Sequence, residues 1–218
     1  EKNKPFFVYF PFYSVHTPIQ ARDELTEKFA NKTPTEDHND AKYAAMIESM
    51  DDAVGTVLDT LDRLELSDNT IVIFTSDNGP MGSISSAYPL RGSKGMFYEG
   101  GIREPLFIRW PGHIEPGSRC EVAVHQTDLY PTLAKAASAT PPKLLDGIDI
   151  SPLWNGQPVK TRNLYWHFPA YLQDYQNNSG ARSPHFRTTP CSTIMQGDWK
   201  LIEYFEDGGI ELYNLKTD

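Results

Sequence analysis

The stretch AKYAAMIESMDDAVGTVLDTLDRLELSDNTIVIFT, residues 41–75, decides the fold class of this chain. From about residue 39 to residue 66 the apolar positions recur in steps of three and four, which places them on one stripe of a helix. A polar break at residues 67–69 is followed by an apolar, β-branched run at residues 70–75, which is typical of a buried strand. A strand directly after a long amphipathic helix indicates an α/β fold with helices packed on a sheet. The predicted stripe consists of Tyr43, Met46, Ile47, Met50, Val54, Val57, Leu58, Leu61 and Leu64.

Two further apolar runs lie on either side of this pair of elements. Residues 6–10 read FFVYF, a continuous run that predicts a strand buried on both faces. Residues 105–110 read PLFIRW and predict a third strand that ends at Pro111-Gly112. Thr127-Asp128 has the character of a helix N-terminus, with Pro131 tolerated in the first turn. We therefore expect a central mixed, largely parallel sheet flanked by helices.

The character of the sequence changes after about residue 155. Short runs rich in β-formers, at residues 164–167, 192–195, 200–204 and 211–213, alternate with polar turns. This spacing predicts an antiparallel meander. We place a boundary near residue 158, between an α/β part at residues 1–158 and a small antiparallel subdomain at residues 159–218.

Composition excludes several classes of protein. The chain has 218 residues, with 20 basic and 29 acidic side chains and a net charge of -9. A nucleic-acid partner is disfavoured, because such proteins normally carry a basic patch. No apolar run approaches the ~18 residues of a membrane span, so we expect no crossing of a bilayer. Cys120 and Cys191 are too few and too far apart for a disulfide framework, which favours two separate buried or half-buried thiols.

Asp77 and Asn78 form the sharpest polar feature of the sequence. They follow the predicted strand at residues 70–75, and the carboxyl ends of strands form the rim where ligands bind in open α/β folds. A carboxylate beside an amide oxygen suits calcium or magnesium better than zinc. The alternative is an Asx turn that closes the strand, since Asp-Asn-Gly favours such turns.

Lys94 and His16 are the two other candidates. Lys94 lies in the sequence RGSKG, where glycines would let the backbone approach an anion, although a solvated loop lysine would look the same. His16 follows the first predicted strand and could contact an anion or act as a general acid, although it could also be merely exposed. If the strands are parallel neighbours, His16, Asp77, Asn78 and Lys94 converge on one rim, as an anion site beside a hard metal.

Taken together, these stretches resemble the type I sulfatase family, near its arylsulfatase and N-acetylgalactosamine-6-sulfatase branch. The order and spacing agree over nearly the whole chain with the C-terminal half of such an enzyme. The resemblance implies an alkaline-phosphatase-like fold. The matching stretches are PFF (5–7), HTP (16–18), YAAMIESMD (43–51), TIVIFTSDNG (70–79), LRGSKG (90–95), YEGGIREP (98–105), DLYPTL (128–133), GDWKLI (197–202) and ELYNL (211–215).

The resemblance implies a role for each matched position. Asp77 and Asn78 are similar to two ligands of the family's single Ca²⁺, for which Mg²⁺ is a possible substitute. Lys94 resembles the lysine that contacts the sulfate and the bridging oxygen, and His16 resembles the histidine that contacts the sulfate and protonates the leaving alcohol. Arg91 and His167 are further candidate substrate contacts, the latter within an aromatic stretch that could stack on sugar rings, although packing in the core or a loop would explain that stretch equally well.

The family nucleophile has no counterpart in this sequence. It is a formylglycine made within a Cys-x-Pro-Ser-Arg type motif, and neither Cys120 nor Cys191 lies in such a motif. The resemblance therefore places the formylglycine on a missing N-terminal segment, which becomes the expected partner of this chain. With only Asp77 and Asn78 as ligands, we expect weak or absent metal binding and no turnover by this chain alone, because Ca²⁺ takes six to eight oxygens.

The expected function is the hydrolysis of sulfate esters, with sulfated carbohydrate as the favoured substrate. The family's usual compartments imply a periplasmic, secreted or lysosomal protein. Two other functions stay open at this point. One is a phosphatase or phosphodiesterase of the wider alkaline-phosphatase-like superfamily, and the other is a non-catalytic sulfatase-like binding protein.

Overall fold

The computed structural model of the chain describes residues 4–173 and 180–218. Within it the chain divides into two units. The first comprises residues 1–70, 74–106 and 171–188, and the second comprises residues 71–73, 107–170 and 189–218. The chain therefore passes between the units more than once, and the division that we predicted near residue 158 stays a prediction.

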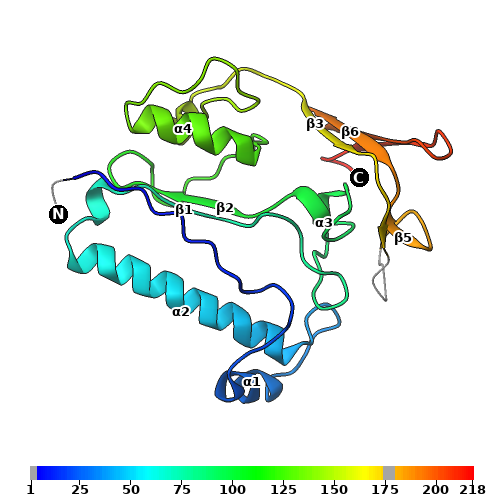
Figure 1. The fold of residues 1–218 in the computed structure, drawn as a ribbon, viewed down its shortest axis with the longest axis horizontal. Coiled ribbons are helices and arrows are strands. Elements are labelled where there is room, and N and C mark those ends of the chain that lie inside the picture. The colour runs from blue at the N-terminus through cyan, green and yellow to red at the C-terminus, as the bar shows by residue number, and fades with distance from the viewer. Residues whose placement is uncertain (1–3, 174–179) are drawn as a thin grey trace. The chain divides into compact units, whose positions relative to one another are not determined.

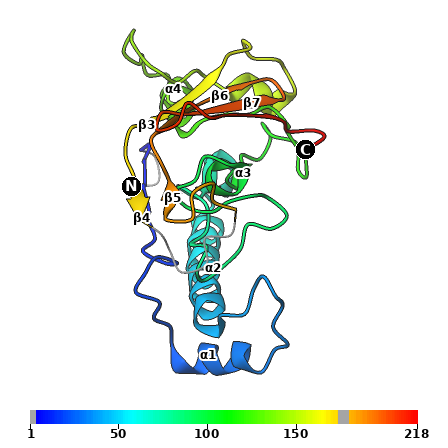
Figure 2. The ribbon, with the colours of Figure 1, turned by 90° about the vertical axis from the view of Figure 1, so that its right-hand side faces the viewer.

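The long helix of the first unit confirms the periodicity of the sequence. Helix α2 (Ala41–Arg63) begins at Asp40, whose carboxylate accepts a hydrogen bond from the backbone N–H of Tyr43 at 2.8 Å. Helix α1 (Asp23–Ala30), which the sequence analysis did not predict, packs against one end of α2, as the two views in Figures 1 and 2 show. An ion pair between Lys28 and Glu48 joins the two helices. Ala45 and Met46 are the buried residues of α2.

The predicted central parallel sheet is not formed by the described residues. Strand β1 (Val72–Thr75) has β2 (Leu106–Arg109) as its one neighbour in a two-stranded sheet. A 3-10 turn, η1 (Ser67–Asn69), separates α2 from β1, as the polar break predicted. Both strands lie where we expected them, but a central sheet needs further strands hydrogen-bonded along the edges of this pair. The described part of the chain supplies no such strands, so our prediction of a central, largely parallel sheet is wrong for these residues.

Residues 6–10 depart furthest from the expectation. They form no strand, and their side chains are exposed rather than buried on both faces. Phe7 and Tyr9, for example, are 77% and 78% exposed. A strand is stabilised by backbone hydrogen bonds to a neighbour, and none is formed by these residues within the described part of the chain.

The second unit contains the predicted antiparallel meander. Strands β3 (Leu164–Phe168), β6 (Cys191–Gln196), β7 (Trp199–Tyr204) and β8 (Ile210–Asn214) form a sheet in that order, with every pairing antiparallel. Alternate residues point to opposite faces, so one face is buried and the other carries exposed apolar side chains. The buried face includes Leu164, Cys191, Ile202 and Tyr204. Cys191 is therefore a core thiol, whereas Cys120 is exposed, which corrects our expectation that both would be at least half-buried.

The second unit also contains the helix predicted after Thr127. Helix α4 (Leu129–Ala136) follows the 3-10 turn η2 (Gln126–Asp128), and Asp128 is fully buried between them. The Asp128 carboxylate accepts hydrogen bonds from the backbone N–H groups of His125 and Ile148, at 2.8 and 2.9 Å, and pairs with Arg162. A buried charge needs this degree of pairing to be tolerated. A further 3-10 turn, η3 (Ser151–Asn155), completes this region.

Three short elements that the sequence did not predict belong to the first unit. Strands β4 (Leu172–Gln173) and β5 (Phe186–Thr188) pair antiparallel, and α3 (Glu99–Ile102) is a single helical turn.

Across the described residues, no helix is both long enough and apolar enough to cross a membrane.

Candidate functional site

Asp77 and Asn78 lie in the turn that directly follows β1. The Ser76 hydroxyl donates to the backbone carbonyl of Asn78 at 3.0 Å, which closes the turn. The side-chain amide of Asn78 donates to the carbonyl of Gly79 at 3.3 Å. This bond uses the amide nitrogen and leaves the amide oxygen as the side chain's acceptor. The two residues thus lie in a turn after the strand and carry the oxygen donors that a hard cation binds, while the metal site and the Asx turn both stay predictions.

Lys94 lies in a loop at residues 76–101, which we call the site loop. Its two ends, at Gly79 and at Gly100 and Gly101, pack closely against each other. The backbone N–H of Gly79 donates to the carbonyl of Gly101 at 3.1 Å, and a Cβ at position 79 would lie 2.1 Å from the carbonyl oxygen of Gly100. A Cβ at position 101 would lie 2.1 Å from the carbonyl oxygen of Met96. No side chain fits at such distances, so the sequence needs glycine for this backbone-to-backbone packing.

The same packing brings Lys94 to the Asp77 turn. The backbone N–H of Lys94 donates to the carbonyl of Pro80 at 2.9 Å. Lys94 is half-buried, and within the described residues its ammonium has no carboxylate at ion-pair distance. A partly desolvated cation without a counter-charge is a favourable position for an anionic ligand. The structure therefore brings together Lys94 and the turn of Asp77 and Asn78, although their roles stay predictions.

Glu104 is a member of this region that the sequence analysis did not single out. The pKa of Glu104 is raised to about 7: burial is the largest cause, the negative charge of Asp77 adds to it, and a hydrogen bond with Ser76 opposes both. Its Oε1 atom is buried and has no hydrogen-bond partner among the described residues. In the sequence Glu104 is one acid directly before a strand, and nothing in that position distinguishes it from a surface charge.

The donors of this region fit a hard divalent cation. Asp77 and Glu104 repel each other electrostatically, and the buried Oε1 of Glu104 lacks a donor, so a cation would relieve both. Carboxylate and amide oxygens are the ligands that Ca²⁺ and Mg²⁺ prefer. Within the described residues no group of three or more His, Cys, Asp or Glu side chains could hold a metal ion. The residues present fit in chemistry, but they supply only a part of a ligand set.

Arg91 is held by contacts within the first unit. Its guanidinium lies over the ring of Tyr98, 3.9 Å from the centroid, and its Nε donates to the carbonyl of Gly180 at 3.0 Å. The backbone carbonyl of Arg91 accepts from the N–H of Gly100 at 2.8 Å, which closes the loop around Lys94. These contacts give Arg91 a structural role, and a contact with substrate stays a prediction.

His16 belongs to the same unit but makes local contacts. Its Nδ1 lies 2.9 Å from the backbone carbonyl of Thr17, and its ring lies 5.9 Å from that of Tyr13. A carbonyl oxygen only accepts, so Nδ1 is the donor of this hydrogen bond and Nε2 is left for other contacts. The side chain is exposed. Its expected convergence with Asp77 and Lys94 stays a prediction, because its described contacts are with Tyr13 and Thr17.

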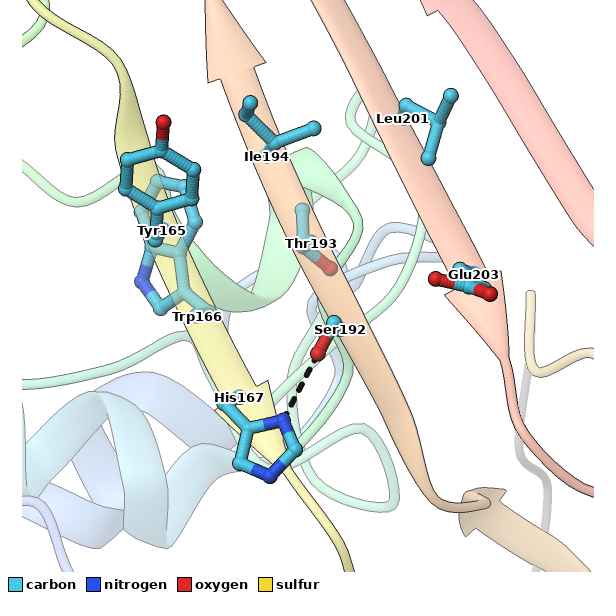
Figure 3. Close-up of a pocket in the computed structure, with 8 residues that line it drawn as sticks. All are labelled: Tyr165, Trp166, His167, Ser192, Thr193, Ile194, Leu201 and Glu203. Atoms are coloured by element: carbon cyan, nitrogen blue, oxygen red, sulfur yellow. Dashed lines mark hydrogen bonds between the residues drawn. The ribbon is translucent and has the colours of Figure 1, made fainter.

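His167 lies in the second unit, on the exposed face of the four-stranded sheet. Its Nδ1 lies 2.8 Å from the hydroxyl of Ser192, and its ring is 5.8 Å from that of Phe205. His167 lines a pocket of about 230 Å³. Figure 3 shows its side chain on the same side of the sheet as Tyr165 and Glu203. The pocket is lined by Tyr165, Trp166, His167, Ser192, Thr193, Ile194, Leu201 and Glu203. Polar and aromatic groups together could bind a sugar, and the predicted substrate role of His167 stays a prediction.

Comparison with protein families identifies the family to which the chain belongs. Residues 1–139 match the family described as Sulfatase, and this region is more than half of the 218 residues. The chain belongs to the sulfatase family. Residues 92–218 of this sulfatase chain also match the family described as N-sulphoglucosamine sulphohydrolase, C-terminal. The resemblance that the motifs indicated is thereby confirmed.

Individual relatives agree with this assignment. The chain is 37% identical to a sulfatase of Formosa agariphila, over 99% of the chain and 41% of the relative. It is 35% identical to human arylsulfatase A, over 86% of the chain and 37% of that protein. The solved structure of Ps i-CgsB in complex with k-i-k-neocarrahexaose has 31% identity and a TM-score of 0.80, over 100% of the chain and 45% of that structure. This likeness supports the alkaline-phosphatase-like sulfatase fold, and the chain spans less than half the length of each of these relatives.

Proposed function

We propose that the protein to which this sulfatase chain belongs hydrolyses sulfate esters. The observation that carries the proposal is the half-buried residue Lys94, whose ammonium lacks an acidic partner among the described residues and whose backbone N–H donates to Pro80 beside the Asp77 turn. A sulfate ester carries one negative charge on its oxygens, and this charge moves toward the bridging oxygen as the bond to the alcohol breaks. A fixed cation at that place stabilises the transition state.

Each candidate residue would contribute one function to this reaction. Lys94 would neutralise the sulfate and the bridging oxygen, and His16, protonated on both ring nitrogens, would donate the proton of its Nε2 to the leaving alcohol. Asp77 and Asn78 would hold Ca²⁺, with Mg²⁺ as the alternative, and Glu104 lies beside them. When bound, the cation would polarise the sulfate oxygens as a Lewis acid. The nucleophile, a formylglycine in this family, would come from a part of the protein outside this chain.

The proposed substrate is a sulfated carbohydrate. Ps i-CgsB, which resembles the whole chain in fold, was solved in complex with k-i-k-neocarrahexaose. The exposed aromatic face beside His167 would suit a sugar ring, because aromatic side chains stack on apolar sugar faces. A periplasmic, secreted or lysosomal compartment goes with this proposal. Neither nucleic acid nor membrane is proposed as a partner, and the net charge of -9 would repel the polyanion.

The complete protein provides the test. Hydrolysis of 4-nitrophenyl sulfate and of k-i-k-neocarrahexaose would be compared with hydrolysis of 4-nitrophenyl phosphate. Lys94→Met should lower kcat/KM for the sulfate esters by about 10²- to 10³-fold, the typical effect of removing one electrostatic contact to the transition state. Lys143→Met is the matched control, because Lys143 is an exposed lysine in the second unit.

Three results of this experiment would each decide something different. Unchanged sulfate ester hydrolysis by Lys94→Met would refute the role of Lys94. Hydrolysis of the phosphate ester with no hydrolysis of sulfate esters would favour the phosphatase alternative. The isolated 218-residue chain, measured alongside, should show no turnover, because the proposal places the nucleophile elsewhere.

A further inference from the structure

Tyr171–Thr188 is separated from the site loop by about seventy residues of sequence, yet it belongs to the same structural unit. The residues before and after it, 107–170 and 189–218, belong to the second unit. Its two strands, β4 and β5, therefore leave the second unit to join the first. Ordering this segment away from its neighbours in sequence costs conformational entropy, which contacts within the first unit must offset.

These contacts converge on Lys94. The Arg187 side chain, on β5, donates from Nη1 to the backbone carbonyl of Lys94 at 3.2 Å. It also donates from Nε to the carbonyl of Gln173, on β4, at 2.7 Å. One half-buried guanidinium thus joins both strands of the hairpin to the lysine of the site loop. The rigid fork of arginine suits this geometry, because its donors point to two acceptors at once.

Packing on both sides of Lys94 supports the same assignment. Gly95 has a φ of +88°, and a Cβ there would lie 2.8 Å from Leu172 of β4 and 3.2 Å from Nη1 of Arg187. On the other side, the carbonyl of Gly180 accepts from Nε of Arg91 at 3.0 Å. The hairpin is therefore in direct contact with the loop before and after Lys94.

We infer that Arg187 is a positioning residue for Lys94, and that the β4–β5 hairpin sets the place of the sulfate-binding ammonium. Nothing in the sequence motifs of the site points to residue 187, since it lies outside every stretch that resembles the family. Arg187 acts on the backbone of Lys94 and does not need to touch substrate. The inference rests on the proposed role of Lys94 in sulfate ester hydrolysis.

A double-mutant cycle in the complete protein tests the inference. Arg187→Gln should lower kcat/KM for 4-nitrophenyl sulfate by about 10- to 100-fold, which is the range for loss of a charged hydrogen bond. In a Lys94→Met background the same substitution should have almost no further effect, because a residue that acts through Lys94 has nothing left to position. Arg187→Lys should be intermediate, since an ammonium lacks the fork that reaches both carbonyls. Arg119→Gln, at an exposed arginine of the second unit, is the control.

The outcomes separate this inference from the proposed function. If Lys94→Met leaves activity unchanged, the proposed role of Lys94 fails and the inference fails with it. If Lys94→Met lowers activity while Arg187→Gln does not, the inference alone fails. An equal loss from Arg187→Gln in both backgrounds would mean that Arg187 acts independently of Lys94. Inhibition by inorganic sulfate gives a second readout, and the inference requires weaker inhibition of Arg187→Lys at an unchanged midpoint of thermal unfolding.

Discussion

Helix α2 and the site loop are both parts of the first unit, and they are built in opposite ways. The helix depends on side-chain volume, because it packs through side chains that include the buried Ala45 and Met46. The site loop depends on the absence of side chains, because Gly79, Gly100 and Gly101 let backbone segments touch. The helix should therefore be sensitive to the removal of atoms, and the loop to their addition. Three substitutions test this contrast.

Removal of volume from the helix should have the largest effect. Met46 is 4% exposed, so Met46→Ala would leave a cavity and should lower the free energy of unfolding by about 2–5 kcal/mol. Val57 belongs to the predicted stripe but is exposed, and Val57→Ala should change stability by less than about 0.5 kcal/mol. Urea unfolding followed by far-UV circular dichroism measures both. Equal effects of the two substitutions would show that burial of Met46 does not stabilise α2.

This helix also marks how far the sequence could predict the fold. Periodicity located α2 to within a few residues, because its signal is spread over many positions that each contribute a little. Alternation and turn residues located the strands of the meander in the same way. The prediction of a central sheet was wrong partly because it used residues 6–10 as a strand. Their apolar composition predicts burial, but it does not identify the neighbouring strand with which they would pair.

The candidate site could also be predicted only in part. Asp77, Asn78 and Lys94 were found because side-chain chemistry is visible in the sequence. Glu104 and Arg187 were missed because their importance comes from a contact. The carboxylate of one lies beside Asp77, and the guanidinium of the other reaches the carbonyl of Lys94 across about ninety residues of chain. A single sequence contains no sign of a contact between side chain and backbone at that separation.

Addition of one methyl group to the site loop should have the next largest effect. In Gly101→Ala the new Cβ would lie 2.1 Å from the carbonyl oxygen of Met96 and 2.6 Å from that of Ser93. Backbone atoms cannot rotate away, so we expect a loss of about 1–3 kcal/mol of unfolding free energy, as in other overpacked sites. Urea unfolding of the purified variant gives this value.

The matched control is the same substitution in the helix. Gly55 lies within α2 and a Cβ there would meet nothing within 4 Å. Gly55→Ala should therefore stabilise the protein by about 1 kcal/mol, the difference in helix propensity between the two residues. One chemical change would thus have opposite signs in the two regions. If both substitutions stabilised the protein, the close approach of Gly101 to Met96 would be wrong.

The smallest effect concerns the polar contact at the start of α2, where a side chain caps the helix. Asp40→Ala removes the carboxylate that accepts from the N–H of Tyr43, and it should cost about 1 kcal/mol of unfolding free energy. Asp40→Asn retains an oxygen acceptor and should stay close to the wild type, since Asn caps helices about as well as Asp. Thermal unfolding of the two variants distinguishes the cap from the charge. Equal destabilisation by Asn and Ala would assign the effect to charge, and α2 would then lack the local, geometry-dependent contact on which the site loop depends throughout.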